Sequence, residues 1–574
     1  MIPMYVERVP NRNSRPAILL REAWREGDRI RKRTLANLSD WPQPKIEALR
    51  RLLKGEPLAN PEALFVVERS LPHGHVEAVL RALRKLKLEQ LLGSRRCRER
   101  DLVVAMIAER LLHPCSKLAT TRLWQTTTLG EEVGVGGTDV DAVYQAMDWL
   151  LARQGRIEVA LAKRHLQEGA LVLYDTSTSY YEGRSCPLAQ FGHGRDGRLG
   201  LPVIAYGVLT DGEGRPVAVQ VYPGSTGDPT TVPDQVEKLR QRFELNRVVL
   251  VGDRGMLTQT QIDTLRQYPG LGWISALRSH AIRELIAEGH LQPTLFDQKN
   301  LAEISSPEFA GERLIACLNP ILAQDRRRTR KELLEATEKE LAKIAAQAAR
   351  RTRKPMSKTE IALKVGRVIH RYKVAKHFDL SIDDGSLRWQ RREDAIHKEE
   401  LLDGIYVIRT SEPAATLSAE DTVRSYKRLA QVERAFRCFK GIDLRVRPIF
   451  HRTEDRVRAH ILICMLAYYV EWHLRKAWAP LLFQDELVDQ DRKHRDPVAP
   501  AQPSKAVLNK KASRETTEGL PAHSLQTLMA ALSCRVRNTC RVRTDPQGTT
   551  FQQVTEPDRL QARAFELLEA YPVT

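Results

Sequence analysis

Three carboxylates stand at positions that suit metal-dependent chemistry on phosphate esters. Asp175 follows the apolar run Leu171–Tyr174, and Asp253 follows the β-branched run Val248–Val251, so each is expected where a buried strand ends. Glu433 lies in a segment with helical spacing. A single aspartate at a strand end is usually a turn or cap residue. Two of them with a helix-borne glutamate are the ligands that a two-metal phosphoryl-transfer site requires, because two divalent cations about 4 Å apart clamp the attacking and leaving oxygens.

The glutamate belongs to the run Ser425–Lys440, SYKRLAQVERAFRCFK, which is predicted to be one helix. Tyr426, Glu433, Arg437 and Lys440 follow one another at offsets of seven, four and three residues, which places them along one helical face. A carboxylate between cations on a helix is commonly a solvated ion pair. The two aspartates favour a functional interpretation, because strand ends and one helix hold metal ligands rigidly.

The motifs around these residues resemble those of bacterial insertion-sequence transposases of the DDE class, in the group with a Tyr–Arg–Glu–Lys signature. That signature is Tyr, two residues, Arg, three residues, Glu, six residues and Lys. Tyr426, Glu433 and Lys440 fall on it, whereas Leu429 occupies the Arg position and Arg428 lies beside it. The resemblance also includes the motifs GDRGM around Asp253, DGIYVIRT at 403–410 and RVRPIFHRTEDRVRAH after Lys440.

The resemblance implies that the protein transposes DNA by metal-dependent strand cleavage and strand transfer. Asp175, Asp253 and Glu433 would be the catalytic residues and would hold two Mg²⁺ ions, for which Mn²⁺ would substitute. The implied partner is double-stranded DNA, as terminal inverted repeats and as target, bound by a homodimer.

The resemblance also assigns DNA contacts near the metals. Arg437 and Lys440 would bind phosphate, Tyr426 would position the DNA backbone, and Arg254 in GDRGM is a further contact. Related transposases carry a β-rich insertion with an aromatic residue that holds a flipped or hairpin-end base. Trp389 is the candidate for that role here, although a Trp on a strand is commonly a core residue.

The elements between residues 170 and 280 predict how the two aspartates meet. Two strand-like runs joined by a DGEG turn follow the first strand, and an amphipathic run then leads into RVVLVGD. The order of three antiparallel strands, helix, strand, helix and strand matches an RNase H-like fold, in which the first and fourth strands are adjacent. The segment FGHGRDGR, 191–198, is expected to be a basic loop between the first strand and the hairpin.

The 180 residues between Asp253 and Glu433 exceed what a compact core needs and predict a large basic insertion. Residues 326–376 contain 17 Lys and Arg against 5 Asp and Glu, and residues 326–352 are predicted to form a long helix. Its first four arginines are the candidate DNA contacts within the insertion, namely Arg326, Arg327, Arg328 and Arg330.

The fold class is therefore predicted to be α/β, an RNase H-like catalytic core with a large basic insertion and a mainly helical N-terminal region. The helical region is assigned to DNA-end binding, and a packing domain with charged outer faces is the alternative. The predicted domains are a small β unit at 1–43, the helical region at 44–165, the core at 166–280 and 400–480, the insertion at 281–399, and a linker with a hairpin and helix at 481–574.

The amino-acid composition limits the classes of molecule that the protein is expected to bind. The chain of 574 residues has a formal net charge of +19, which predicts a polyanionic partner, with nucleic acid the leading candidate. The longest apolar stretch, near Ile461–Val470, is too short to span a bilayer, so no membrane association is expected. The N-terminus lacks the apolar core of a signal peptide, and we expect a cytoplasmic, nucleoid-associated bacterial protein.

Two other functions share these features. Another RNase H-like metal nuclease, such as a resolvase, would use the same carboxylates without needing the basic insertion. A non-catalytic DNA-binding descendant is the second alternative; loss of any carboxylate would favour it, and Asp175, Asp253 and Glu433 are all present.

Overall fold

The computed structural model describes residues 4–12, 15–56, 64–198, 200–543 and 548–572. The chain divides into two units, of which the smaller contains Met1–His73 and Arg535–Glu556 and the larger contains Gly74–Cys534 and Pro557–Thr574. The candidate site lies in the larger unit.

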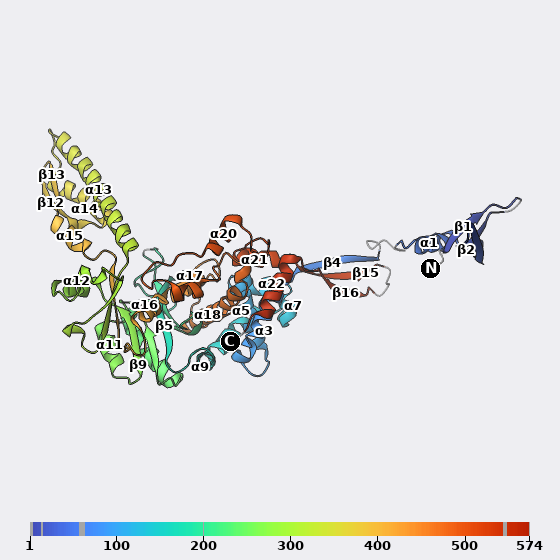
Figure 1. Cartoon of the computed structure of the whole chain (residues 1–574), viewed down its shortest axis with the longest axis horizontal. Helices are drawn as coiled ribbons and strands as arrows, with labels where there is room; N and C mark the ends of the chain where they lie inside the picture. The colour runs from blue at the N-terminus through green and yellow to red at the C-terminus, as the bar shows by residue number, and fades with distance from the viewer. Residues whose placement is uncertain (1–3, 13–14, 57–63, 199, 544–547, 573–574) are drawn as a thin grey trace. The chain divides into compact units, whose positions relative to one another are not determined.

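A mixed sheet of eight strands forms the centre of the larger unit (Figure 1). Its first five strands in chain order lie in the spatial order β7-β6-β5-β8-β9, with β5, β6 and β7 antiparallel and with β8 parallel to both β5 and β9. This arrangement confirms the predicted RNase H-like fold. The strands are β5 (Ala170–Tyr180), β6 (Val203–Asp211), β7 (Pro216–Pro223), β8 (Val248–Val251) and β9 (Leu271–Ala276).

Three further strands extend the sheet beyond β9. β14 (Ile405–Thr410) pairs antiparallel with β9, which confirms that DGIYVIRT returns the chain to the core. β11 (Arg313–Leu318) pairs with β14, and β10 (Leu301–Ile304) forms the edge. Residues 301–318, expected in the insertion, therefore build the core sheet, because the nearly buried run RLIACL pairs along the whole length of β14.

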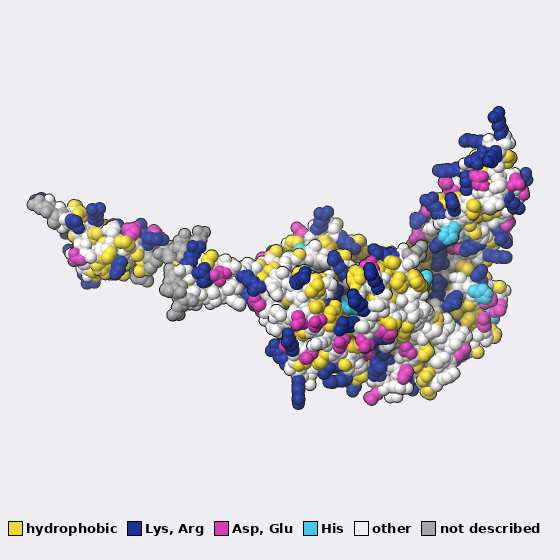
Figure 2. Space-filling model, turned by 180° about the vertical axis from the view of Figure 1, so that it is seen from behind, with side chains coloured by type: hydrophobic (Ala, Val, Ile, Leu, Met, Phe, Trp, Pro, Cys, Tyr) yellow, Lys and Arg dark blue, Asp and Glu magenta, His cyan; other side chains and the backbone are white. Residues whose placement is uncertain are grey.

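The remainder of the insertion has its own small apolar core. α13 (Pro320–Arg350) contains the predicted long helix, and it begins earlier than expected because Asn319 Oδ1 accepts a hydrogen bond from the Leu322 amide at 3.1 Å. α14 (Lys358–Tyr372) and the hairpin β12 (Phe378–Asp383) and β13 (Ser386–Arg391) pack against it, and α15 (Glu393–Glu400) follows. Lys and Arg side chains gather along this segment (Figure 2).

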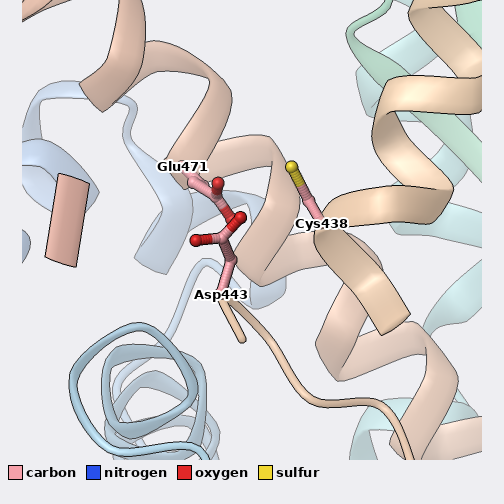
Figure 3. A group of neighbouring side chains, drawn as sticks. All are labelled: Cys438, Asp443 and Glu471. Carbon is pink, nitrogen blue, oxygen red and sulfur yellow. The ribbon is translucent and has the colours of Figure 1, made fainter. Parts of the chain in front are cut away.

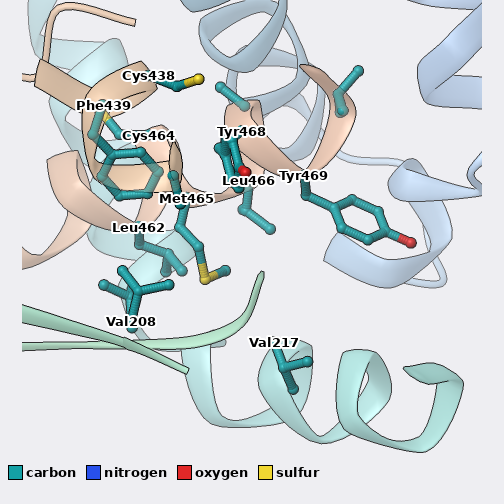
Figure 4. Packing of buried hydrophobic residues seen from close by; sticks show 14 of the residues in the cluster. Val208, Val217, Cys438, Phe439, Leu462, Cys464, Met465, Leu466, Tyr468 and Tyr469 are labelled. Atoms are coloured by element: carbon teal, nitrogen blue, oxygen red, sulfur yellow. The ribbon is translucent and has the colours of Figure 1, made fainter. Parts of the chain in front are cut away.

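α18 (Glu454–Ala477) is buried over most of its length. It packs against β7, α5 (Arg98–Leu112) and α8 (Val140–Leu151), so helices from the N-terminal region cover the core. Figure 4 shows its side chains Leu462 and Met465 beside Val208 of the sheet. No helix in the described part of the chain is long and apolar enough to cross a membrane.

Helices between the main elements complete the larger unit. They are α3 (Gly74–Lys85), α4 (Leu88–Leu92), α6 (Lys117–Leu123), α7 (Leu129–Val133), α9 (Gln154–His165), α10 (Val232–Glu237), α11 (Gln259–Arg266), α12 (Ser279–Ala287), α19 (Val488–His494), α20 (Lys505–Ser513), α21 (Leu525–Ser533) and α22 (Arg559–Ala570). The stretch 483–517, expected as a linker, thus contains α19 and α20. Ser504, the N-cap residue of α20, donates a hydrogen bond from its amide to Asp485 Oδ2 at 2.7 Å, three residues before α19 begins.

In its described residues, the smaller unit contains two three-stranded sheets and the helix α1. β1 (Met4–Val9), β2 (Ala17–Glu26) and β3 (Arg29–Asn37) form the predicted antiparallel sheet, followed by α1 (Gln43–Leu53). The predicted C-terminal hairpin, β15 (Val536–Val542) and β16 (Thr550–Val554), is also present. Its third strand is β4 (Phe65–Pro72), which lies in the region expected to be mainly helical and pairs with β15.

Candidate functional site

The sheet places Asp175 and Asp253 side by side. β5 and β8 run parallel with Leu173 opposite Val251, and each aspartate lies two residues further along its chain. Asp175 faces the same side of the sheet as Leu173, and Asp253 lies two residues past the end of β8, where its charge acts on Asp175. Asp175 lies in the middle of β5 and not at its end, because the polar residues after it continue to pair with β6. The neighbouring strand β8 nevertheless ends before the level of Asp175, because its last residue, Val251, lies opposite Leu173.

The surroundings of Asp175 leave its negative charge poorly compensated. Burial and, secondarily, the nearby carboxylate of Asp253 raise the pKa of Asp175 to about 7. The Thr176 amide, which donates to its Oδ1 at 2.7 Å, and Arg195 oppose this rise. Asp253 Oδ1 accepts from the amides of Gly255 and Met256 at 3.0 and 2.7 Å. A divalent cation between the two carboxylates would relieve their repulsion.

Tyr426 connects these aspartates with Glu433. Burial, and then the charge of Asp253, raise the pKa of the Tyr426 hydroxyl to about 12, and the charges of Glu433 and Asp175 act in the same direction. Glu433 is on α17 (Leu429–Lys440), which packs against β5. Its side chain is 62% exposed, and Arg437 Nη1 lies 3.9 Å from its Oε2.

The predicted single helix is in fact two helices. α16 (Ala419–Lys427) carries Tyr426 and ends before α17 begins at Leu429. At the junction, Arg428 donates from Nη1 to the Gly212 carbonyl at 3.2 Å and to Glu213 Oε1 at 2.8 Å. Arg428 therefore fixes the junction of the two helices to the β6–β7 turn. Leu429, which occupies the Arg position of the signature, is half-buried.

Lys440 does not share the exposed environment of Glu433. Its ammonium lies 3.0 Å from Asp196 Oδ1, which Arg447 also contacts at 2.7 Å, and the Lys440 and Asp196 side chains are 14% and 5% exposed. Burial lowers the pKa of Lys440, although Asp196 opposes this effect. The structure thus gives Lys440 a buried protein partner from the 191–198 loop, and its contact with phosphate stays a prediction.

A fourth carboxylate near the site was not predicted from the sequence. Asp228 accepts from Thr176 Oγ1 at 2.6 Å and is ion-paired with Arg195, and its charge contributes to the raised pKa of Asp175. Arg195 also donates to the Thr176 carbonyl. In the sequence, Asp228 looks like an ordinary cap residue before Pro229, so no local signal distinguishes it.

The other predicted DNA contacts lie away from the carboxylates, with the exception of Arg254, which is exposed directly after Asp253. Arg326, Arg327 and Arg328 are exposed on α13. Arg330 is buried there, 2.5 Å from Asp403 Oδ1, so the structure assigns it to the anchoring of the helix and not to a surface contact. Trp389 lies half-buried between two apolar clusters of the insertion, as expected for a core residue.

A second acidic group lies on the other side of α17. Ligand atoms of Cys438, Asp443 and Glu471 lie within 4.8 Å of one another, and their side chains point toward a common centre (Figure 3). Arg475 compensates both carboxylates, at 3.0 Å from Asp443 and 2.6 Å from Glu471. Burial raises the pKa of the Cys438 thiol, which keeps it neutral. This group is therefore a buried ion-pair network and is less suited to cations than the Asp175–Asp253 pair.

Comparisons with known proteins agree with the geometry. The family profile described as the Transposase DDE domain matches residues 189–470, and the one described as the IS1634 family transposase N-terminal domain matches residues 6–62. Asp253 and Glu433 lie inside the first match and Asp175 precedes it.

No curated protein matches the sequence. Among solved structures, the cryo-EM structure of a piggyBac transposase synaptic complex with hairpin DNA is similar at a TM-score of 0.33 and 9% identity, covering 80% of this chain and 77% of that chain. The two family matches together cover more than half of the sequence. The chain belongs to the insertion-sequence transposases of the DDE class.

Proposed function

We propose that this protein cleaves DNA strands at the ends of an insertion sequence and joins them to target DNA, with Asp175, Asp253 and Glu433 as the catalytic residues. The observation that carries the proposal is the register of β5 and β8, which brings the two aspartates together where β8 ends. The charges of all three carboxylates act on the Tyr426 hydroxyl, which supports a single site.

The residues fit a pair of Mg²⁺ ions, or Mn²⁺ in their place. Hard divalent cations prefer carboxylate oxygens, and the mutual repulsion of Asp175 and Asp253 is the electrostatic state that such cations relieve. When bound, the ions supply an activated water or 3′-hydroxyl and stabilise the leaving oxygen. Arg195 is ion-paired with Asp228, and Asp228 accepts a hydrogen bond from the Thr176 hydroxyl. These contacts would position the strand that carries Asp175.

Residues around the carboxylates would bind the DNA. The side chains of Arg254 and Arg437 lie close to the carboxylates in sequence and are exposed, so phosphate can reach them. The Tyr426 hydroxyl stays protonated at neutral pH and would donate a hydrogen bond to the DNA backbone. Tyr426, Glu433 and Lys440 also support membership of the group with the Tyr–Arg–Glu–Lys signature.

The insertion and the terminal regions would complete the DNA-binding surface. Arg326, Arg327 and Arg328 would contact phosphate, and Trp389 would act on a base only if the hairpin β12–β13 opened toward the DNA. We assign residues 44–165 to recognition of the terminal inverted repeats and expect a homodimer in the DNA complex. The domain boundaries given above for the core and the insertion remain part of this proposal, with β10 and β11 counted in the core sheet.

Strand-cleavage assays on an end substrate test the proposal. Asp175→Ala, Asp253→Ala and Glu433→Ala should each abolish cleavage and leave gel-shift affinity nearly unchanged, since affinity comes mainly from phosphate contacts elsewhere. Asp443→Ala, in the second acidic group, is the matched control for loss of a carboxylate and should retain cleavage if it folds. Robust cleavage by any of the first three variants would remove that residue from the site.

A further inference from the structure

A strongly basic pocket lies beside the core, outside the carboxylate site. Its volume is about 530 Å³, within the range of pockets that hold small ligands. Among the described residues that line it there is no aspartate or glutamate. Six of them are cations, namely Arg110, Lys117, Arg445, Arg447, Arg452 and Arg456.

Two of these cations are buried without a carboxylate partner. Lys117 is 4% exposed, and none of the described side chains or carbonyls accepts a hydrogen bond from it. Arg110 is 5% exposed, and its guanidinium donates to the carbonyls of Leu444, Arg445 and Cys115 at 3.4, 3.5 and 3.2 Å. Burying a cation costs free energy unless an anion compensates its charge. We therefore expect an anion from outside the protein to bind beside Lys117 and Arg110.

The charge of the neighbouring Glu109 interacts with Arg110, but this carboxylate lies outside the pocket. Glu109 is 1% exposed, does not line the pocket, and has His113 Nδ1 at 3.3 Å. Burial, and then the charge of Arg110, lower the pKa of Lys117 to about 7, as expected for an ammonium group that faces cations and no anion.

The same pocket offers an aromatic surface. The Arg456 guanidinium lies over the Tyr144 ring at 4.3 Å, and the His451 ring meets Tyr144 edge-on at 6.1 Å. Phe450 also lines the pocket and is 55% exposed, so its ring is accessible to a ligand. Cations with exposed aromatic rings are the combination that binds a phosphate together with an unstacked base.

The pocket is tied to the strand and the helix that carry the catalytic carboxylates. Ile449 bridges to Tyr181 just after the end of β5, and Arg447 shares Asp196 with Lys440 at the end of α17. The guanidinium of Arg447, which lines the pocket, lies over the Tyr180 ring at 5.3 Å, and Tyr180 is five residues from Asp175 on β5, about 17 Å at roughly 3.3 Å per residue. At about 3.4 Å per nucleotide step, that distance corresponds to about five steps of duplex.

We propose that the pocket formed by Arg110, Lys117, Arg445, Arg452, Arg456 and Phe450 binds one nucleotide of the DNA strand, about five steps from the cleaved phosphate, by its phosphate and its unstacked base. The inference rests on the proposed DNA cleavage. It adds a second anchor point that fixes the direction in which the strand leaves the carboxylates. The buried Lys117 and Arg110, together with the exposed Arg445 and Arg452, bind the phosphate, and Phe450 stacks on the base.

The test compares two double variants of the full-length protein in binding to an end duplex. Arg445→Gln with Arg452→Gln removes two exposed pocket cations that have no carboxylate partner among the described residues. Arg156→Gln with Lys163→Gln removes two exposed cations from α9 and is the charge-matched control. The slope of log affinity against log salt should fall by up to about 0.9 for each lost contact in the pocket variant and stay unchanged in the control.

Two further arms define the ligand. Ethylation of individual phosphates should interfere with wild-type binding about five steps from the cleavage point, and this interference should disappear in the pocket variant. Phe450→Ala should weaken binding about tenfold when the nucleotide at that position is unpaired, because base–aromatic stacking contributes about that much. Inorganic phosphate and a deoxynucleoside monophosphate, titrated alone, show whether the pocket takes a free anion.

The results of these binding tests either support or overturn the proposed nucleotide pocket. An unchanged salt slope in the pocket variant, or an equal loss in the α9 control, would overturn the inference. So would a pocket that binds the free monophosphate while the pocket variant keeps wild-type affinity for DNA. If the wild-type protein fails to cleave but the pocket variant still loses salt slope and the ethylation signal, the proposed cleavage fails and the DNA-binding pocket stands.

Discussion

Replacing Arg330 by glutamine tests whether a buried ion pair anchors the basic helix α13. The Arg330 guanidinium lies 2.5 Å from Asp403 and 3.4 Å from Glu400, and the Arg330 and Asp403 side chains are 8% and 3% exposed. Removing one partner of a buried pair costs about 3–5 kcal/mol, because the remaining charge loses its compensation. Asp403 Oδ2 already has no hydrogen-bond partner among the described residues, so Arg330→Gln should cost about 3 kcal/mol or more.

Hydrogen exchange is the suitable assay, because a chain with several domains does not unfold in one step. Amides in the first half of α13 and in β14 should exchange about a hundredfold faster in Arg330→Gln, since every 1.4 kcal/mol is about tenfold. Arg327→Gln, on the same helix but exposed, is the matched control and should leave exchange unchanged. Equal protection in both variants would refute the anchoring role and return Arg330 to the candidate DNA contacts.

Three other perturbations have defined outcomes. Replacing Arg326, Arg327 and Arg328 by glutamine should lower the salt slope of DNA binding by up to about 0.9 per lost contact; an unchanged slope would mean that this surface of α13 is only solvated. Lys440→Met should leave Mn²⁺ binding intact in calorimetry while Glu433→Gln weakens it, because an ammonium group has no lone pair for a metal; equal losses would contradict the placement of α17. Lys117 has its pKa lowered to about 7 by burial and by Arg110, whereas the unfolded chain holds this proton until about pH 10. The melting temperature should therefore rise between pH 7 and 10, and Lys117→Met should flatten that rise, whereas an identical profile would place Lys117 in solvent.

The sequence predicted those parts of the site that depend on local patterns. The β-branched run before Asp253 and the apolar run before Asp175 predicted two strands, the match of the element order to an RNase H-like fold predicted that they are adjacent, and the register confirms that adjacency. The spacing of Tyr426 and Glu433 predicted helical structure around both, although the break at Arg428 depends on its contact with Gly212 and Glu213, which lie about 215 residues earlier.

Contacts between distant segments could not be predicted. Lys440 looked like a free cation on a helix because its partner, Asp196, lies in a loop 244 residues earlier. Arg330 looked equivalent to its neighbours until the fold brought Asp403 to it. β10 and β11 were not distinguished from the insertion, since LAEI and RLIACL are short runs whose strand pairing depends on β14. The pocket around Lys117 likewise combines residues from the N-terminal helices and from the segment after α17.

Counting bound Mn²⁺ ions tests most directly whether Asp175, Asp253 and Glu433 form the metal site. Electron paramagnetic resonance of free Mn²⁺ would be followed during titration of the full-length protein with an end duplex. The wild-type protein and Asp443→Asn should each take up two ions per chain, whereas Asp253→Asn should lose this uptake. Full uptake by Asp253→Asn, together with its loss in Asp443→Asn, would contradict this account and assign the metals to Cys438, Asp443 and Glu471.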